Sequence, residues 1–198
     1  MISVYNIKPK FQQLLKPILT RLHKAGVTAN QITVSSIVLS LVIGIAFWYA
    51  DVYHFLFIFL PVGLLVRMAL NALDGMMART YNQQSKKGEV LNEAGDIVSD
   101  LFIYFPLLKF QAVNLYLIVL FLCLSIINEF AGLLGKAVSG QRRYDGPMGK
   151  SDRAFVISIY GLLQFFYIPV SAYGEWIFSV INILLVISTY IRIKKSFQ

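Results

Sequence analysis

The chain has 198 residues, of which 57% are hydrophobic and only 14% are charged, and its mean hydropathy is +0.65. Soluble domains contain about 25% charged residues, so this composition argues against a soluble globular protein. The net charge of +8 does not indicate a nucleic-acid-binding protein either, because the Lys and Arg residues are confined to short segments between long uncharged runs.

Residues 1–27 form a basic, amphipathic first element. The Lys and Arg residues of this element fall mostly on one face of a helix, and apolar residues recur at helical spacing on the other, at Phe11, Leu14, Leu15, Ile18, Leu19 and Leu22. This pattern predicts a helix that lies in the cytoplasmic membrane interface. We expect it either to anchor the chain to anionic lipids or to line or gate an active site. Thr28 or Asn30 is the expected N-cap of the helix that follows.

Six apolar runs come next, each close to the roughly 20 residues that cross the hydrocarbon core of a bilayer. They predict membrane spans near residues 31–50, 54–78, 90–110, 112–136, 153–173 and 176–192. Most of the 18 Lys and Arg residues lie in or beside the segments on one side of these spans. By the positive-inside rule, this asymmetry predicts that both termini are cytoplasmic.

The sequence therefore predicts an all-α integral membrane protein with six transmembrane helices, preceded by an N-terminal interfacial amphipathic helix. We expect one membrane domain over residues 1–198, in which residues 1–27 form the interfacial helix and residues 28–198 form the six-helix bundle. Membrane lipids are the expected surroundings of this bundle.

The second and third predicted spans contain polar residues that a purely structural span does not need, namely Arg67, Asn71, Asp74, Asn92, Glu93, Asp96, Ser99 and Asp100. A carboxylate at the centre of a bilayer costs roughly 2.5–3.5 kcal/mol to insert, so such residues usually serve a function. Side chains three or four residues apart share one helix face, and the short polar connection 80–89 makes the two helices antiparallel neighbours. Their oxygen-bearing side chains should therefore converge at one cytoplasmic depth. The alternative is an internal salt-bridge network in which Arg67 and Arg79 neutralise the acids.

Oxygen side chains of this kind suit a hard cation such as Mg²⁺ or Mn²⁺, which commonly shares its coordination with substrate phosphates. Gly75, Ala78 and Gly88 leave bare helix surface that a flat ring or a diphosphate could approach, and Arg79 supplies a charged donor for a phosphate. The sequence thus points to a phosphate-bearing ligand bound with a divalent cation.

Every spacing in residues 71–96 matches the signature D-x2-D-G-x2-A-R-x8-G-x3-D-x3-D, and the chain therefore resembles the CDP-alcohol phosphotransferases. The segment TANQIT at residues 28–33 is similar to the T-P-N-x-x-T entry into the first span of that family. The resemblance implies transfer of a phosphatidyl group from CDP-diacylglycerol to a polar alcohol acceptor, with release of CMP, in phospholipid biosynthesis. It also implies a divalent cation, a bacterial inner membrane and a homodimer.

The resemblance assigns roles residue by residue. Asp96 is the expected general base, and Gly75, Ala78, Arg79 and Gly88 are expected to bind cytidine and phosphate. The expected metal ligands are Asn71, Asp74, Asn92 and Asp96, with Asp100 as an additional ligand one helical turn beyond Asp96.

Two positions depart from the signature, because its first and third aspartates are Asn71 and Asn92 in this chain. An amide oxygen can bind a cation but contributes no negative charge. Three outcomes stay open: an enzyme with weaker or single-metal binding, an enzyme with a changed substrate, or an inert homologue that binds a CDP-lipid and regulates a lipid enzyme. A transporter is disfavoured, because no polar residues on the far side continue a pathway.

A second polar cluster lies between the fourth and fifth predicted spans. Arg143, Lys150 and Arg153 resemble the basic residues with which family members bind the acceptor, and Glu129 is expected to line the same pocket. The alternatives are charge that fixes membrane orientation for the basic residues and an internal salt bridge for Glu129. Arg67 is expected either to approach the phosphates or to pair with Asp74. Residue types alone do not identify the acceptor.

Overall fold

The computed structural model describes residues 8–110, 114–168 and 170–197. Within these ranges the regular structure is helical throughout, which confirms the prediction of an all-α protein. Predicted elements that reach residues 1–7, 111–113, 169 or 198 lie partly outside the described ranges. The chain divides into two compact units, the N-terminal unit Met1–Ile103 and the C-terminal unit Tyr104–Gln198.

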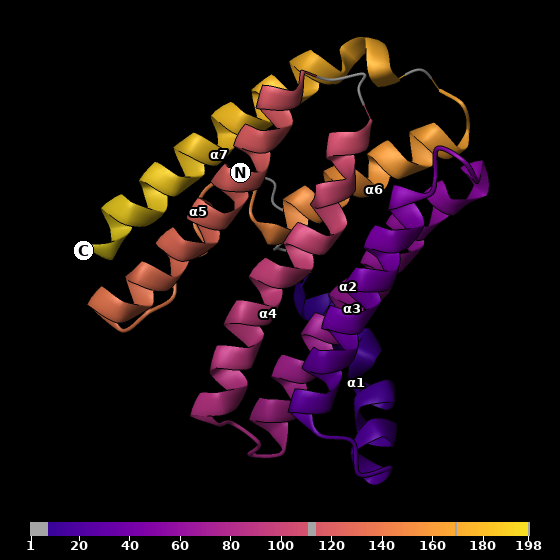
Figure 1. The fold of residues 1–198 in the computed structure, drawn as a ribbon. Helices are drawn as coiled ribbons and strands as arrows, with labels where there is room; N and C mark the ends of the chain where they lie inside the picture. The colour runs from indigo at the N-terminus through magenta and orange to yellow at the C-terminus, as the bar shows by residue number, and fades with distance from the viewer. Residues whose placement is uncertain (1–7, 111–113, 169, 198) are drawn as a thin grey trace. The chain divides into compact units, whose positions relative to one another are not determined.

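The N-terminal unit contains α1 (Lys8–Lys24), α2 (Ala29–Trp48), the short 3-10 helix η2 (His54–Ile58), α3 (Phe59–Thr80) and α4 (Lys86–Tyr104) up to Ile103 (Figure 1). Thr28 is the N-cap of α2, because its hydroxyl accepts from the Gln31 backbone N–H while the Gln31 side chain accepts from the Thr28 backbone N–H. This reciprocal pair is a capping box, and it satisfies two backbone donors that would otherwise lack partners.

The amphipathic helix α1 packs against α3. Leu15 and Leu19 are buried in a cluster with residues of α2 and α3, which include Ala29, Ile32, Leu73, Met76 and Met77. Leu14 and Ile18, which the sequence placed on the same apolar face, are exposed. The face of α1 is therefore divided between a protein contact and a part that is free to contact lipid.

The C-terminal unit contains η3 (Phe105–Lys109), α5 (Leu115–Ser139), α6 (Lys150–Phe165), η4 (Val170–Tyr173) and α7 (Gly174–Ser196). Helices α5 and α7 run side by side (Figure 1). They are joined by a hydrogen bond of 3.2 Å from Asn128 Nδ2 to Thr189 Oγ1 and by an edge-to-face contact between Phe121 and Phe178. Polar contacts of this kind fix the register of two otherwise apolar helices.

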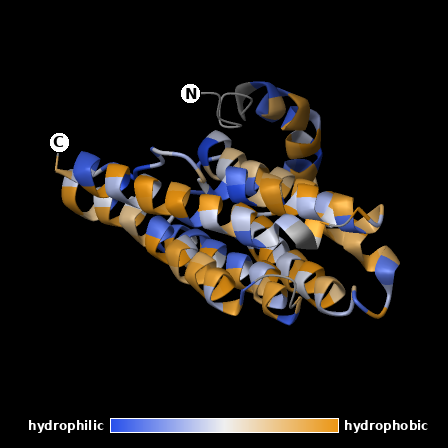
Figure 2. Cartoon of the chain, turned by 90° about the horizontal axis from the view of Figure 1, so that it is seen from above, coloured by the Kyte–Doolittle hydropathy of each residue, from blue (hydrophilic) through white to orange (hydrophobic). Residues whose placement is uncertain are grey.

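Four helical segments of the described chain are long and apolar enough to cross a membrane: Ala29–Trp48, His54–Thr80, Leu115–Ser139 and Gly174–Ser196. Figure 2 shows hydrophobic residues along much of the length of the helices. The other two predicted spans correspond to α4, which begins at Lys86 and has charged and polar residues in its first half, and to α6, which has 16 residues. The prediction of six crossings, and that of a single membrane domain, stay predictions.

Candidate functional site

The polar residues of the sequence signature lie on α3 and α4, which are antiparallel helices joined by residues 81–85. An ion pair fixes their register, because Arg67 Nη2 lies 2.9 Å from Asp100 Oδ1 and both side chains are buried. Asn71 and Asp96 lie four residues from this ion pair towards the connection, on α3 and α4 respectively. Asp74 and Asn92 lie about one further helical turn in the same direction.

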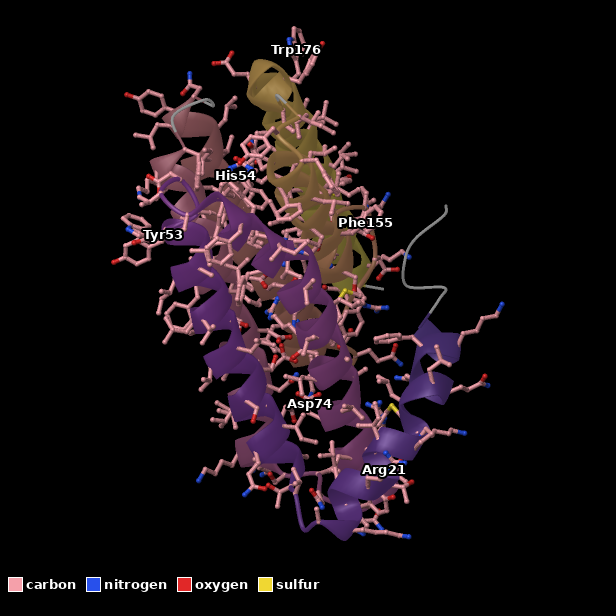
Figure 3. All side chains as sticks on the ribbon, turned by 90° about the vertical axis from the view of Figure 1, so that its right-hand side faces the viewer. Arg21, Tyr53, His54, Asp74, Phe155 and Trp176 are labelled. Carbon is pink, nitrogen blue, oxygen red and sulfur yellow. The ribbon has the colours of Figure 1, made fainter. Side chains whose placement is uncertain are left out.

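Helix α2 forms a third wall of this site. Thr33 Oγ1 donates to Asp74 Oδ2 over 3.0 Å, and Ser36 Oγ donates to Asn71 Oδ1 over 2.7 Å. Asp74 lies among the helices of the N-terminal unit (Figure 3). The sequence analysis missed both hydroxyl groups. Their signal was present, since Thr33, Ser36 and Ser40 recur on one face of an otherwise apolar helix, and all three are buried.

Glycines on α4 allow it to approach α2 closely. A Cβ atom added at Gly95 would lie 2.6 Å from Ile37 Cδ1 and 4.0 Å from Thr33 Cγ2. Because Thr33 also contacts Asp74, the backbone next to Asp96 lies within one side chain's reach of the Asp74 carboxylate. The structure thus brings the α4 backbone at Gly95, which precedes Asp96, close to Thr33, the hydrogen-bond partner of Asp74.

The residues expected to bind nucleotide differ in their surroundings. A Cβ at Gly75 would lie 3.3 Å from Arg79 Nη1, so the exposed Arg79 guanidinium folds back over bare backbone at Gly75, and Ala78 is half-buried beside it. At Gly88 the space is occupied by protein, since a Cβ there would lie 2.7 Å from Asn30 Oδ1. Gly88 therefore permits a close contact with Asn30 of α2, whereas Gly75 is covered by the side chain of Arg79.

The donor atoms of the site suit a hard divalent cation, because Asp74, Asp96, Asn71 and Asn92 all offer oxygen. The total negative charge of these four side chains is low for binding a divalent cation, because two of them are amides. Among the described residues, no three His, Cys, Asp or Glu side chains gather as a metal-binding group. Asp100, which was expected as an additional metal ligand, is paired with Arg67 in the structure. This ion pair is of the kind expected in the alternative, an internal salt-bridge network.

A second polar site lies within the C-terminal unit around Glu129 of α5. Its carboxylate lies 2.7 Å from Arg142 Nη2, 2.9 Å from Arg153 Nη2 and 3.8 Å from Arg192 Nη1. Arg153 and Arg192 are essentially inaccessible to solvent. Three guanidinium groups therefore surround one carboxylate, and this arginine cluster, defined as Glu129, Arg142, Arg153 and Arg192, has an excess of two positive charges.

The connection between α5 and α6 is held against the arginine cluster by backbone contacts. Arg153 Nη1 donates to the Met148 carbonyl over 3.2 Å, and Arg192 Nε donates to the Asp145 carbonyl over 3.2 Å. Arg192 Nη1 also donates to the Asn128 carbonyl over 2.8 Å. These bonds hold the arginine side chains in fixed positions, although the connection between α5 and α6 is irregular.

The sequence analysis identified only part of this cluster. It selected Glu129 and Arg153, and it selected Arg143 where the structure places the guanidinium of Arg142. Arg143 lies against α5, where its backbone N–H donates to the Gly132 carbonyl over 3.1 Å. Lys150 is half-buried and begins α6. Arg192, on α7, was not among the residues selected from the sequence.

The fold and the sequence both match known proteins. The sequence profile of the CDP-alcohol phosphatidyltransferase family matches residues 26–191. The chain is 44% identical over 184 residues to the inner membrane protein YnbA of Escherichia coli K12, covering 93% of this chain and 91% of that protein. It is 33% identical over 99 residues to the archaetidylinositol phosphate synthase of Pyrococcus horikoshii, covering half of each protein.

Two solved structures of the phosphatidylinositol phosphate synthase PgsA1 of Mycobacterium tuberculosis share the fold. One contains manganese and citrate and matches with a TM-score of 0.71 at 21% identity, over 92% of this chain and 88% of that one. The other contains bound CDP-DAG and matches with a TM-score of 0.73 at 22% identity, over 94% of each chain.

Proposed function

Since the chain belongs to the CDP-alcohol phosphatidyltransferase family, we propose that it transfers the phosphatidyl group of CDP-diacylglycerol to a polar alcohol and releases CMP. This proposal is supported by the signature spacing that puts Asp74 on α3 and Asp96 on α4, two helices that the Arg67–Asp100 ion pair joins. The bound CDP-DAG in a protein of the same fold supports the same donor.

In this proposal, Asp96 accepts the proton of the acceptor hydroxyl group. The acceptor oxygen then forms a bond to the phosphatidyl phosphorus, and the bond from that phosphorus to the leaving CMP oxygen breaks. Arg79, which lies over Gly75, donates hydrogen bonds to the diphosphate. Ala78 and Gly88, the other small residues of the signature, would contact the nucleotide at the same ends of α3 and α4.

Asp74 and Asp96 would hold a divalent cation such as Mg²⁺ or Mn²⁺, with Asn71 and Asn92 as the neighbouring signature residues, and manganese is present in a protein of the same fold. When bound, such a cation neutralises negative charge that develops on the leaving phosphate. Thr33 and Ser36 position two of these side chains through the hydrogen bonds from α2.

The arginine cluster supports an acceptor that itself carries a phosphate. Its excess of two positive charges matches a phosphate monoester, which has nearly two negative charges near neutral pH. Guanidinium groups bind phosphate oxygens through paired hydrogen bonds. The synthases named among the similar proteins make phospholipids that contain inositol phosphate, and a phosphorylated polyol is therefore the acceptor class that we propose. Lys150 and Arg143 would contribute further positive charge.

The proposal includes a location. Four described helices can cross a membrane, and we propose that α4 and α6 complete six crossings, with the termini on the cytoplasmic side, where the positive residues gather. The 44% identity to an inner membrane protein of a bacterium supports the inner membrane. We propose that α1 lies in the cytoplasmic interface and that the chain forms a homodimer.

The test is release of CMP from CDP-diacylglycerol by the purified chain with a pooled set of alcohols, including glycerol phosphate and inositol phosphate. We expect release that depends on the alcohol and is abolished by Asp96→Asn. Ser35→Ala is the matched control, since Ser35 is exposed on α2 and bonds only to the Gln31 carbonyl of its own helix. Nucleotide binding without CMP release over the whole pool would instead support an inert CDP-lipid-binding homologue.

A further inference from the structure

The amide group of Asn71 is oriented by α2. Ser36, which is buried, donates to Asn71 Oδ1 over 2.7 Å. An amide has a single oxygen, and because that of Asn71 accepts from Ser36, its NH₂ group is the part that remains for a ligand. The group that Asn71 can offer to a ligand is therefore a hydrogen-bond donor.

The number of anionic oxygens limits how many cations the site can hold. A carboxylate has two oxygens and can bridge two cations, whereas an amide has one oxygen, and that of Asn71 already accepts from Ser36. Asp74 Oδ2 accepts from Thr33, and Asp100 Oδ1 is paired with Arg67. Mg²⁺ and Mn²⁺ prefer about six oxygen ligands each. Among the four signature positions, two such ions would have to share the carboxylates of Asp74 and Asp96.

From the two amides and the orientation of Asn71, we infer that this site binds one divalent cation, through Asp74 and Asp96. We further infer that the NH₂ group of Asn71 donates a hydrogen bond to a phosphate oxygen of the donor. Asn92, one turn from Asp96 on α4, is the second uncharged position of the site. This inference rests on the proposed donor, a cytidine diphosphate lipid. A hydrogen bond from the neutral Asn71 amide would take the place of part of the positive charge that a second cation would supply. Ser36, which bonds to this amide, would then be a positioning residue.

The first experiment counts bound Mn²⁺ on the purified chain in detergent, with saturating CDP-diacylglycerol and no alcohol, by equilibrium dialysis and electron paramagnetic resonance. We expect one Mn²⁺ per chain for the natural protein and for Ser35→Ala, and two for the double variant Asn71→Asp with Asn92→Asp. Two ions on the natural protein, or none, would overturn the inference. If the double variant does not fold, the count on the natural protein decides alone.

The second experiment measures CDP binding in EDTA, where only protein groups act on the phosphates. Asn71→Ala should weaken CDP binding about tenfold, the size expected for a hydrogen bond to a charged group. Asn71→Asp should weaken it at least as much, because it places a negative charge beside the phosphates. Unchanged binding by Asn71→Ala in EDTA would overturn the donor role of Asn71. CMP release measured on the same preparations separates these outcomes from a failure of the proposed transferase activity.

Discussion

The ion pair between Arg67 and Asp100 should be the main anchor between α3 and α4, and Asp100→Asn should therefore destabilise the protein strongly. The two charged atoms lie 2.9 Å apart and the side chains are 2% and 7% exposed. With an effective dielectric constant of about 20, Coulomb's law gives an attraction of about 6 kcal/mol at this distance. Measured losses for removing one member of a buried pair are about 3–5 kcal/mol, since the remaining charge stays buried. We expect the free energy of unfolding to fall by about that amount.

The assay is unfolding of the purified chain by SDS in mixed micelles, followed by circular dichroism. The double variant Arg67→Met with Asp100→Leu is the matched control, because it removes both charges and leaves none uncompensated. We expect it to recover most of the stability that Asp100→Asn loses. The reasoning would be refuted if Asp100→Asn left unfolding unchanged to within about 0.5 kcal/mol and weakened Mn²⁺ binding, which would make Asp100 a metal ligand.

Three further predictions concern the other contacts. Arg153→Met should raise the KM for a phosphorylated acceptor at least about tenfold, because it removes one positive charge of the arginine cluster, and should leave the KM for CDP-diacylglycerol unchanged in the CMP release assay. Equal effects on both would contradict an acceptor role for the cluster. Thr33→Val should slow CMP release about tenfold with little change in thermal stability, because it removes the hydrogen bond to Asp74; a normal rate would show that Asp74 needs no such support. Gly44→Ala should lower the free energy of unfolding by about 1–3 kcal/mol in the SDS assay, because the added Cβ would collide with the Phe102 carbonyl of α4. An unchanged unfolding midpoint would mean that α4 can move away from α2.

The sequence predicted the positions of the helices well, because apolar runs and their polar boundaries are local features. Thr28 and Asn30 were the two N-cap candidates for α2. In the structure Thr28 is the N-cap, whereas the side chain of Asn30 lies next to Gly88. Helices α4 and α6 proved shorter than the spans expected near 90–110 and 153–173. Their ends could not be read from hydropathy, because η3 and η4 continue the apolar composition after each helix has ended.

The signature spacing was enough to place Asn71, Asp74, Asn92 and Asp96 on facing helices, because three- and four-residue spacing defines a helix face. The partners of these residues were not predictable in the same way. The contacts of Ser36 with Asn71 and of Arg67 with Asp100 join residues more than thirty positions apart, and no local pattern selects one polar partner over another. The sequence can identify which polar side chains need a hydrogen-bond or ion-pair partner, whereas the packing of the helices determines which residue is that partner.

In the arginine cluster, too, the sequence did not predict which residue makes a contact, although the two candidates are neighbours in the chain. Arg142 and Arg143 are adjacent in sequence and chemically identical, and the choice between them depends on the path of an irregular connection. That path turns at Gly140, which has a positive φ of 72° as the C-cap of α5. Gly132 then admits the backbone of Arg143, which leaves the side chain of Arg142 to reach Glu129.

The contact of α1 with α3 has a consequence for shortened versions of the chain. Leu15 and Leu19 cover Leu73, Met76 and Met77, which alternate with Asp74 and Gly75 along the same turns of α3, and the ring of His23 stacks on Tyr81 at 3.5 Å, directly after that helix. A protein that began after Lys24 would expose these methionine and leucine side chains to the aqueous boundary, on the helix that contains Gly75, which we propose to bind the nucleotide. Such a truncation would be expected to aggregate or to lose activity even though it removes no residue of the signature.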